Sequence, residues 1–422
     1  MTDHRTPLVL VTGLHRRLCA QVGTRFLDRP GTVVVHHDVS RLGEGVVLRS
    51  ERERTGTGVV ERSTAVELAH GCLSCTLRLD LLPLLRRLAR RDDVSRVVLH
   101  LDPALETEHL CWAVGDVVLD EEPRGLPETA GDRVRVDGVL AVVEAASWLD
   151  DVTSGDDLGD RGLAATPDDE RTLAQVALAQ VACADAVVLA GPPADAWAGA
   201  RLDAVLDRLV PSAPRADLRL HPDRLLAAVG PAARRGRVSS AHDPLLAGEP
   251  PRGEDCGVQL VRFSPDRPLH PGRLHDALDV LLDGVVSSRG RLWLASQHDR
   301  AVWLESAGPG LRMGDAGPWL ATLDDEAWSA VDPQRRVSAA LRWDPVHGDR
   351  HTELVVLTHR QPVLAITAAL HAAVLTDEEW AAGPEAWRRY RDPFGSWHED
   401  PCEASGPADD SSTSATNREE RS

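Results

Sequence analysis

Five short apolar runs, separated by segments with a helical pattern, constrain the fold of this chain more than any other feature. The runs are rich in β-branched residues and cover residues 8–12, 32–38, 96–102, 138–146 and 184–191. Helical patterns accompany them at residues 78–91, 170–182 and 200–210. Because buried parallel strands are almost continuously apolar and are joined through helices, this alternation predicts an α/β domain with a doubly wound, mostly parallel sheet.

The carboxyl ends of these strands should mark the ligand site. In a doubly wound sheet, ligands bind in the crevice beyond those ends. The segments that follow the predicted strands are residues 13–20, 36–38, 100–103 and 191–193. We therefore expect these segments to line one crevice.

A second unit follows a change of composition near residue 230. Residues 231–257 are rich in Pro, Gly and Ser, which predicts a linker between a domain at 1–230 and another at 258–395. The second unit contains apolar runs at 258–265, 291–296, 301–308, 338–345 and 352–359 and helical patterns at 270–285 and 364–374. This pattern predicts a smaller α+β domain. Most tryptophans lie there, which suggests a separate core with indole packing.

Charge and cysteine content exclude several classes of protein. The net charge of −19 argues against binding to nucleic acid or an anionic membrane. There is no long apolar run or signal-type N-terminus, so we expect a cytoplasmic protein. The seven cysteines are odd in number and mostly scattered, which argues against a disulfide scaffold. The tail at 396–422 is polar and acidic, and its composition predicts disorder.

The exception to the scattered cysteines is the pair Cys72 and Cys75, which forms a C-x-x-C motif. This spacing lets two thiolates bind one tetrahedral ion, and such soft ligands suit Zn²⁺ better than Mg²⁺. Further ligands would come from a set of nearby or crevice residues: Glu67, His70, His36 and His37. A redox pair and two inert core residues are the alternative interpretations. Since successive strand residues face opposite sides, His36 and His37 should not both point at one ion.

The order of these segments resembles the CobW family. The shared features are a strand ending in VTG at 11–13, the cysteine motif, VVEAASWLDD at 142–151, DERTLAQ at 169–175, and C-terminal strings at 267–278, 284–296, 343–355 and 375–387. The resemblance implies a P-loop GTPase fold followed by a CobW C-terminal domain. It also implies metal handling, chiefly zinc delivery to a metalloprotein client under nucleotide control.

The nucleotide motifs of that family are degenerate in this chain. A phosphate loop needs a second glycine, a lysine and a Mg²⁺-binding hydroxyl, yet the segment from Gly13 to Ala20 keeps only Gly13. Cys19 stands in the place of the lysine, and the chain has no lysine anywhere. Residues 190–193, with the sequence AGPP, stand in the place of the guanine-reading motif. Residues 100–103, with the sequence HLDP, stand in the place of the acidic motif after the third strand.

Some anion-binding groups remain at this loop. Arg16 and Arg17, together with Gly13 and the amides of the following helix, could still meet a phosphate. The loss of the other groups nevertheless predicts that the chain lacks GTP hydrolysis, and it argues against GTP and Mg²⁺ as cofactors. The cysteine motif also departs from the family, whose C-x-C-C has a cysteine where this chain has Ser74.

These observations predict a cytoplasmic, CobW-like zinc-handling protein of the pseudo-GTPase kind, acting as a metallochaperone, reservoir or sensor. One alternative is a divergent GTPase whose phosphates are held by Arg16, Arg17 and backbone amides. Another is a metal-free scaffold for protein interaction. The sequence names no client and does not separate Zn²⁺ from Co²⁺ or Ni²⁺.

Overall fold

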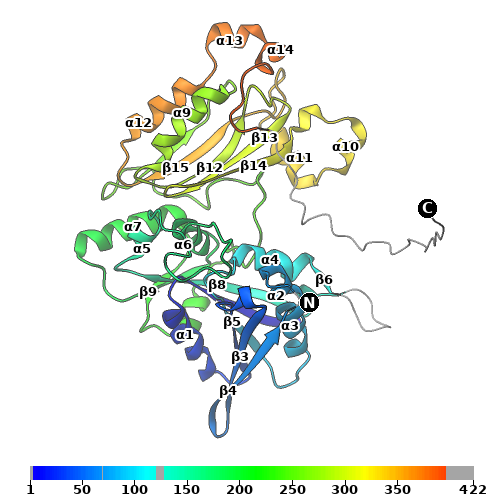
Figure 1. The fold of residues 1–422 in the computed structure, drawn as a ribbon, viewed down its shortest axis with the longest axis vertical. Coiled ribbons are helices and arrows are strands. Elements are labelled where there is room, and N and C mark those ends of the chain that lie inside the picture. Colours follow the sequence, from blue (N-terminus) through cyan, green and yellow to red (C-terminus); the bar gives the residue numbers. More distant parts are fainter. Residues whose placement is uncertain (1–2, 69, 120–127, 396–422) are drawn as a thin grey trace, which may run out of the picture.

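Two β-sheets, each with its own helices, make up the computed structural model (Figure 1), which describes residues 3–68, 70–119 and 128–395. The predicted disordered tail at 396–422 lies outside the described residues. None of the helices in the described ranges has the length and apolar character that a membrane crossing requires.

The first sheet has eight strands. In spatial order they are β10 (Arg215–Asp217), β9 (Ala186–Ala190), β8 (Val134–Glu144), β1 (Thr6–Thr12), β5 (Arg96–His100), β2 (Thr32–Asp38), β3 (Val46–Thr55) and β4 (Gly58–Glu67). The six strands from β10 to β2 are parallel, whereas β3 and β4 pair antiparallel. The predicted α/β sheet is therefore confirmed.

Helices cover both faces of this sheet. The apolar cluster on one face includes residues of α1 (Arg16–Arg25) and α8 (Pro222–Ala227). The clusters on the other face include residues of α3 (Leu82–Ala89), α4 (Thr107–Asp116), α6 (Leu173–Ala182) and α7 (Ala196–Leu209). The predicted helix 78–91 is divided, because α2 (Leu73–Thr76) and a π-helical stretch at Leu77–Leu81 precede α3.

The remaining elements of the first domain are short. They are α5 (Trp148–Asp151), the strand pair β6 (Val118–Leu119) and β7 (Glu128–Thr129), and 3-10 helices at Phe26–Asp28, Leu42–Glu44 and Ala130–Asp132.

The hairpin of β3 and β4 was not predicted from the sequence. Most of its side chains are charged or polar, half-buried in β3 and exposed in β4, so no apolar run marks either strand. The hairpin matters for function because β4 ends at Glu67, just before the cysteine motif.

The second sheet is antiparallel and has five strands. Their order is β11 (Gln259–Phe263), β15 (Glu353–Thr358), β12 (Val285–Trp293), β13 (Arg300–Ala307) and β14 (Gly310–Pro318). One face packs on α9 (Pro271–Leu282) and α12 (Val363–Ala373), which confirms the predicted α+β class. Short helices complete the unit: α10 (Asp325–Ala330), α11 (Pro333–Ala340), α13 (Asp377–Ala382), α14 (Pro384–Trp387) and a 3-10 turn at Leu320–Thr322.

Two details of this unit differ from the sequence pattern. The run 338–345 forms the end of α11 and a turn, whereas β14 was not marked by any apolar run. The expected indole cluster is present beside the aliphatic core, with Trp293, Trp319 and Trp387 all buried.

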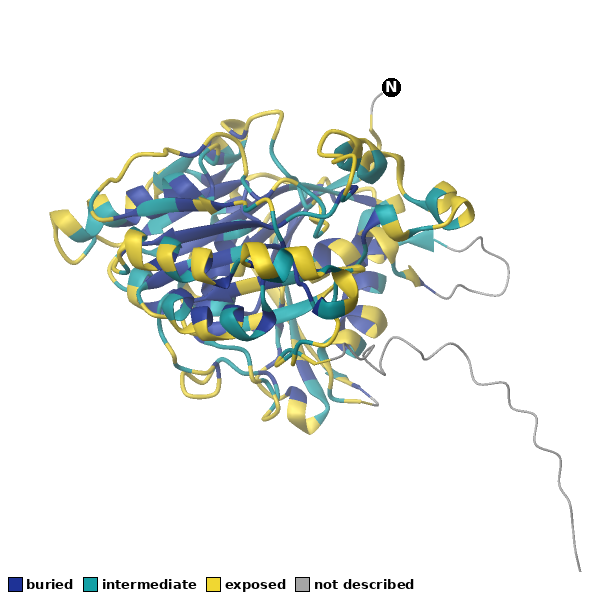
Figure 2. Cartoon of the chain, turned by 90° about the horizontal axis from the view of Figure 1, so that it is seen from above, coloured by how far each residue is buried: buried dark blue, intermediate teal, exposed yellow. Residues whose placement is uncertain are grey.

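The two sheets are held together through the helix layer between them (Figure 1), and the buried residues lie in the interior of the molecule (Figure 2). One apolar cluster joins residues of α6 and α7 to Val286 and Leu357 of the second sheet. The turn between β13 and β14 lies directly on α6, because a Cβ atom added at Gly310 would be 2.7 Å from the Thr172 hydroxyl. The second sheet is therefore packed against the first domain.

The predicted linker 231–257 has no regular helix or strand but is tied down by arginines. Arg291 of β12 donates hydrogen bonds to the carbonyl oxygens of Ala241 and Asp243, both at 2.9 Å. Arg289 donates from Nε to the Leu245 carbonyl oxygen at 3.0 Å. These hydrogen bonds hold the segment against the second sheet.

Candidate metal and nucleotide sites

The segment from Gly13 to Ala20, predicted to be a degenerate phosphate loop, follows β1 at the carboxyl edge of the parallel strands. Gly13 is required there by sterics, since an added Cβ atom would lie 2.5 Å from the Val142 carbonyl oxygen and 2.9 Å from Cys19 Sγ. Cys19 is fully buried, and this burial raises the pKa of its thiol to about 12. The residue at the lysine position is therefore a neutral part of the core.

The charge of Arg16 at this loop is neutralised by Asp102. Arg16 Nε and one terminal nitrogen of its guanidinium donate to the two carboxylate oxygens of Asp102, at 2.8 and 3.2 Å. The Asp102 side chain is 0% exposed and that of Arg16 is 30% exposed. Burial opposes the charge on Arg16, but the hydrogen bonds and charge of Asp102 outweigh it and raise the pKa of Arg16. Arg17 is exposed. Of the predicted anion-binding groups, Arg16 is thus already paired.

The two histidines at the end of β2 face opposite sides of the sheet, as predicted. The His36 ring stacks on the His100 ring with centroids 4.1 Å apart, and its Nδ1–H donates to the His100 carbonyl oxygen at 2.9 Å. Burial lowers the pKa of His36, and it lowers the pKa of His100 to about 2. His37 is 0% exposed, and its Nε2 lies 2.7 Å from the Asp80 carboxylate. Both predicted ligands therefore already have partners in the sheet.

The cysteine motif forms the amino-terminal turn of α2. Cys72 is the N-cap, and its Sγ accepts a hydrogen bond from the Cys75 amide at 3.3 Å. Cys72 is exposed and Cys75 is half-buried. The side-chain hydrogen bond with Cys72, together with partial burial, raises the pKa of the Cys75 thiol to about 11. The geometry brings the two thiols to one exposed turn.

The backbone next to the motif is held close to the rest of the domain. A Cβ atom added at Gly71 would lie 2.3 Å from the Leu42 carbonyl oxygen, so only glycine allows this approach. Glu67 and His70, the other predicted ligands near the motif, are both exposed. Among the described ranges, no three His, Cys, Asp or Glu side chains lie close enough together to hold a metal ion. The structure therefore brings Cys72 and Cys75 together without a third side chain of this kind in place.

A cavity of about 480 Å³ opens beside the motif, lined by Cys72 and Ser74. Four potential ligands in its wall were not predicted from the sequence: Glu106, His109, Asp168 and Asp169. Their position could have indicated them, because Glu106 and His109 follow β5 and so lie near the carboxyl ends of the parallel strands. Arg171 closes part of the wall, donating to Asp169 at 2.7 and 2.8 Å and to Glu106 at 2.9 Å.

Two family models match the sequence. Residues 44–191 match the nucleotide-binding domain of CobW/HypB/UreG, and residues 258–374 match the cobalamin synthesis protein cobW C-terminal domain. The first match begins after the segment from Gly13 to Ala20 and still includes the cysteine motif.

Curated relatives cover nearly the whole chain. A Mycobacterium tuberculosis protein named Zinc chaperone Rv0106 is 45% identical over 402 residues, which is 94% of this chain and 95% of that protein. The Zinc-regulated GTPase metalloprotein activator 1 of Dictyostelium discoideum is 26% identical over 386 residues, covering 86% and 77% of the two chains. Among solved structures, the Zn(II)-bound YjiA GTPase from E. coli is 15% identical, with a TM-score of 0.35 and coverage of 88% and 99%.

Proposed function

The chain belongs to the CobW family, and we propose that it binds zinc at Cys72 and Cys75 and passes the ion to a metalloprotein client without hydrolysing GTP. One observation carries this proposal: the two thiols share an exposed helix turn beside a cavity whose lining includes carboxylate and imidazole side chains. Two sulfur atoms at a helix N-terminus are a suitable start for a tetrahedral zinc site. The names of the relatives, zinc chaperone and metalloprotein activator, support the same role.

The remaining ligands explain why such an ion could be delivered. Glu67 and His70 are exposed next to the motif, and His109 and Asp168 line the cavity. We propose that they complete the site weakly, so that one coordination position stays open to a client side chain, as in zinc sites that exchange ligands. His36 and His37 stay as candidates, but each would first have to leave its present partner.

The loss of nucleotide control rests on the loop. The pairing of Arg16 with Asp102 and the burial of Cys19 remove the charges that would hold a phosphate chain, and Ala20 has no hydroxyl for Mg²⁺. The specific alternative is a divergent GTP-binding protein in which Arg16 exchanges Asp102 for a phosphate beside Arg17. A metal-free scaffold is the second alternative. We place the protein in the cytoplasm, where the reducing environment keeps a thiol pair such as Cys72 and Cys75 free.

Zinc titration against a chelator of known affinity tests the proposal on the full-length protein. We expect the wild type and Cys256→Ser, a change at a free cysteine outside the motif, to bind zinc tightly and alike. The double variant Cys72→Ser with Cys75→Ser should lose this site. Equal affinity and stoichiometry in the double variant would overturn the metal site, and saturable GTP binding by calorimetry would favour the divergent GTPase.

A further inference from the structure

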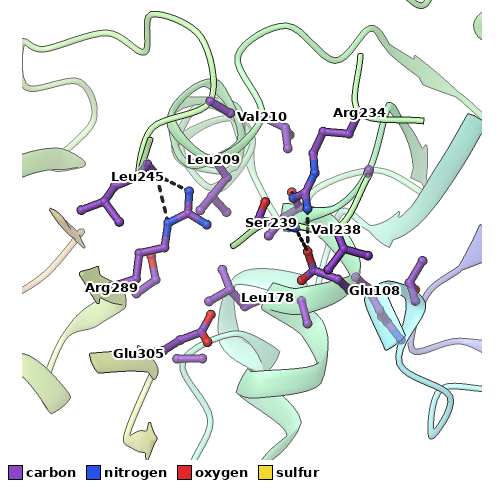
Figure 3. Close-up of a pocket in the computed structure, with 18 of the residues that line it drawn as sticks. Glu108, Leu178, Leu209, Val210, Arg234, Val238, Ser239, Leu245, Arg289 and Glu305 are labelled. Carbon is purple, nitrogen blue, oxygen red and sulfur yellow. Dashed lines mark hydrogen bonds and ion pairs between the residues drawn. The ribbon is translucent and has the colours of Figure 1, made fainter. Parts of the chain in front are cut away.

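A second and larger cavity, of about 1150 Å³, lies between the two domains (Figure 3). Helices α4, α6 and α7 form one side, and strands β12, β13 and β15 form the other. The segment at 230–248 closes it, tied to the second sheet by Arg289 and Arg291. Cavities that bind small molecules usually have volumes of this order, and they occur preferentially between domains.

The centre of this cavity is apolar. Its lining includes Leu178 of α6, Leu209 and Val210 at the end of α7, and Val355 and Leu357 of β15. Figure 3 shows Leu178, Leu209 and Val210 between the two groups of charged side chains. An apolar part of a ligand would be shielded from water here, which favours burial by roughly 25 cal/mol per Å² of apolar surface.

One wall carries a row of charges across three neighbouring strands. Arg289 of β12 is the register partner of Glu305 of β13, and Glu305 is the register partner of Arg312 of β14. All three residues line the cavity. In the part of the chain that the structure describes, neither Glu305 nor Arg312 forms a hydrogen bond or ion pair, and the hydrogen bonds of Arg289 go only to the Leu245 carbonyl oxygen.

The opposite wall differs because it carries a closed ion pair. Arg234 pairs with the Glu108 carboxylate at 2.6 Å, and the same carboxylate accepts a hydrogen bond from the Ser239 amide at 2.9 Å (Figure 3). Burial lowers the pKa of Arg289, and the charge of Glu305 only partly opposes this effect. Arg289 is half-buried, whereas Glu305 and Arg312 are exposed. A partly desolvated guanidinium without a carboxylate acceptor is costly, so Arg289 is the group on this wall that a ligand carboxylate would satisfy.

We propose that this cavity binds a small zwitterion of the amino-acid type. The ligand carboxylate pairs with the Arg289 guanidinium, the ammonium group pairs with the neighbouring Glu305, and an apolar side chain packs against Leu178 and Leu209. The alternating signs of the row favour a zwitterion over a simple anion, because Glu305 repels a ligand that carries only negative charge.

The probes for testing this site are L-leucine, L-methionine and L-phenylalanine. Two partial ligands are compared with them, 4-methylpentanoate without the ammonium group and 3-methylbutylamine without the carboxylate. Calorimetry and thermal unfolding of the full-length protein should show saturable binding of at least one amino acid. Each partial ligand should bind about tenfold more weakly or worse, because a charge-assisted hydrogen bond is lost.

Matched variants locate the binding. Glu305→Gln should remove the preference for the amino acid over 4-methylpentanoate, whereas Glu378→Gln, at an exposed position on α13, should keep it. The double variant Cys72→Ser with Cys75→Ser should bind the amino acid as the wild type does, which separates this site from the zinc motif. The proposal is overturned if none of the amino acids binds saturably, or if Glu305→Gln binds all ligands as the wild type does.

Discussion

The pairing of Arg16 with Asp102 gives the sharpest test of how the degenerate loop is stabilised. Asp102 is 0% exposed and Arg16 is 30% exposed, so the two partners are not equivalent. In Arg16→Ala, the Asp102 carboxylate stays buried and keeps the Ala104 backbone N–H, at 3.1 Å, as its hydrogen-bond donor among the described residues. Leaving such a charge without its partner costs about 3–5 kcal/mol.

The reverse substitution should cost less. In Asp102→Ala, the Arg16 guanidinium is already partly exposed and can turn towards water, which limits the loss to about 1–3 kcal/mol. In the double variant neither charge remains, so its destabilisation should be smaller than the sum of the two single changes. Arg17→Ala is the matched control, because this neighbouring arginine is exposed and should change stability by no more than about 0.5 kcal/mol.

Urea unfolding of the full-length protein, followed by tryptophan fluorescence and circular dichroism, measures these differences. The buried Trp148 reports on the first domain. The reasoning is refuted if Asp102→Ala is as destabilising as Arg16→Ala, or if the two changes are additive. Either result would mean that the pair is not the counter-charge that closes the loop.

Three further predictions concern backbone packing, acid stability and zinc binding. Gly290→Ala should unfold the second domain or cost more than about 3 kcal/mol, because the new Cβ atom would lie 2.1 Å from a carbonyl oxygen of β15. Gly314→Ala is the control, since nothing lies within 4 Å of a Cβ atom at that position. Thermal unfolding should show a large loss of stability for the first variant and a small one for the second. The hydrogen bonds of Arg273 lower the pKa of Glu379 to about 2. The stabilisation from this pair should therefore be complete above the unfolded pKa near 4.5 and lost as the pH falls towards 2. Glu379→Gln should reduce this acid dependence in melting curves, and an unchanged curve would contradict the assignment. Since the pKa of the Cys75 thiol is about 11, zinc binding should release its proton, and the zinc affinity should rise as the pH increases from 6 to 8. Calorimetry in buffers of different ionisation enthalpy measures the proton release. Binding without proton release would argue against a Cys75 thiolate ligand.

The strands that sequence reasoning found are those with continuous apolar runs. Strands β1, β2, β5, β8 and β9 are buried on both faces, so their composition alone identifies them. Strands β4 and β14 lie at sheet edges, and β3 is the strand next to the edge. All three were missed because most of their side chains are polar or at least partly exposed, and for such strands alternation is a weak signal.

The candidate site was predicted in the same uneven way. Cys72 and Cys75 are three residues apart, so a single helix turn brings their sulfur atoms together whatever the rest of the chain does. His37 was grouped with them, yet the structure pairs its ring with Asp80 from a segment that no local pattern links to β2. The cavity residues His109 and Asp168 could not be connected to the motif before the chain was folded.

The sequence by itself determined the class of the sheet and the family, and it predicted a degenerate phosphate loop, because each of these depends on residue types within short segments. Only the tertiary structure decided that Asp102 neutralises Arg16, that the histidines at the end of β2 already have partners, and that a charged row faces a cavity between the domains. These outcomes depend on residues far apart in the chain. Their energies arise from burial and from pairing across strands, and neither can be read from spacing along the sequence.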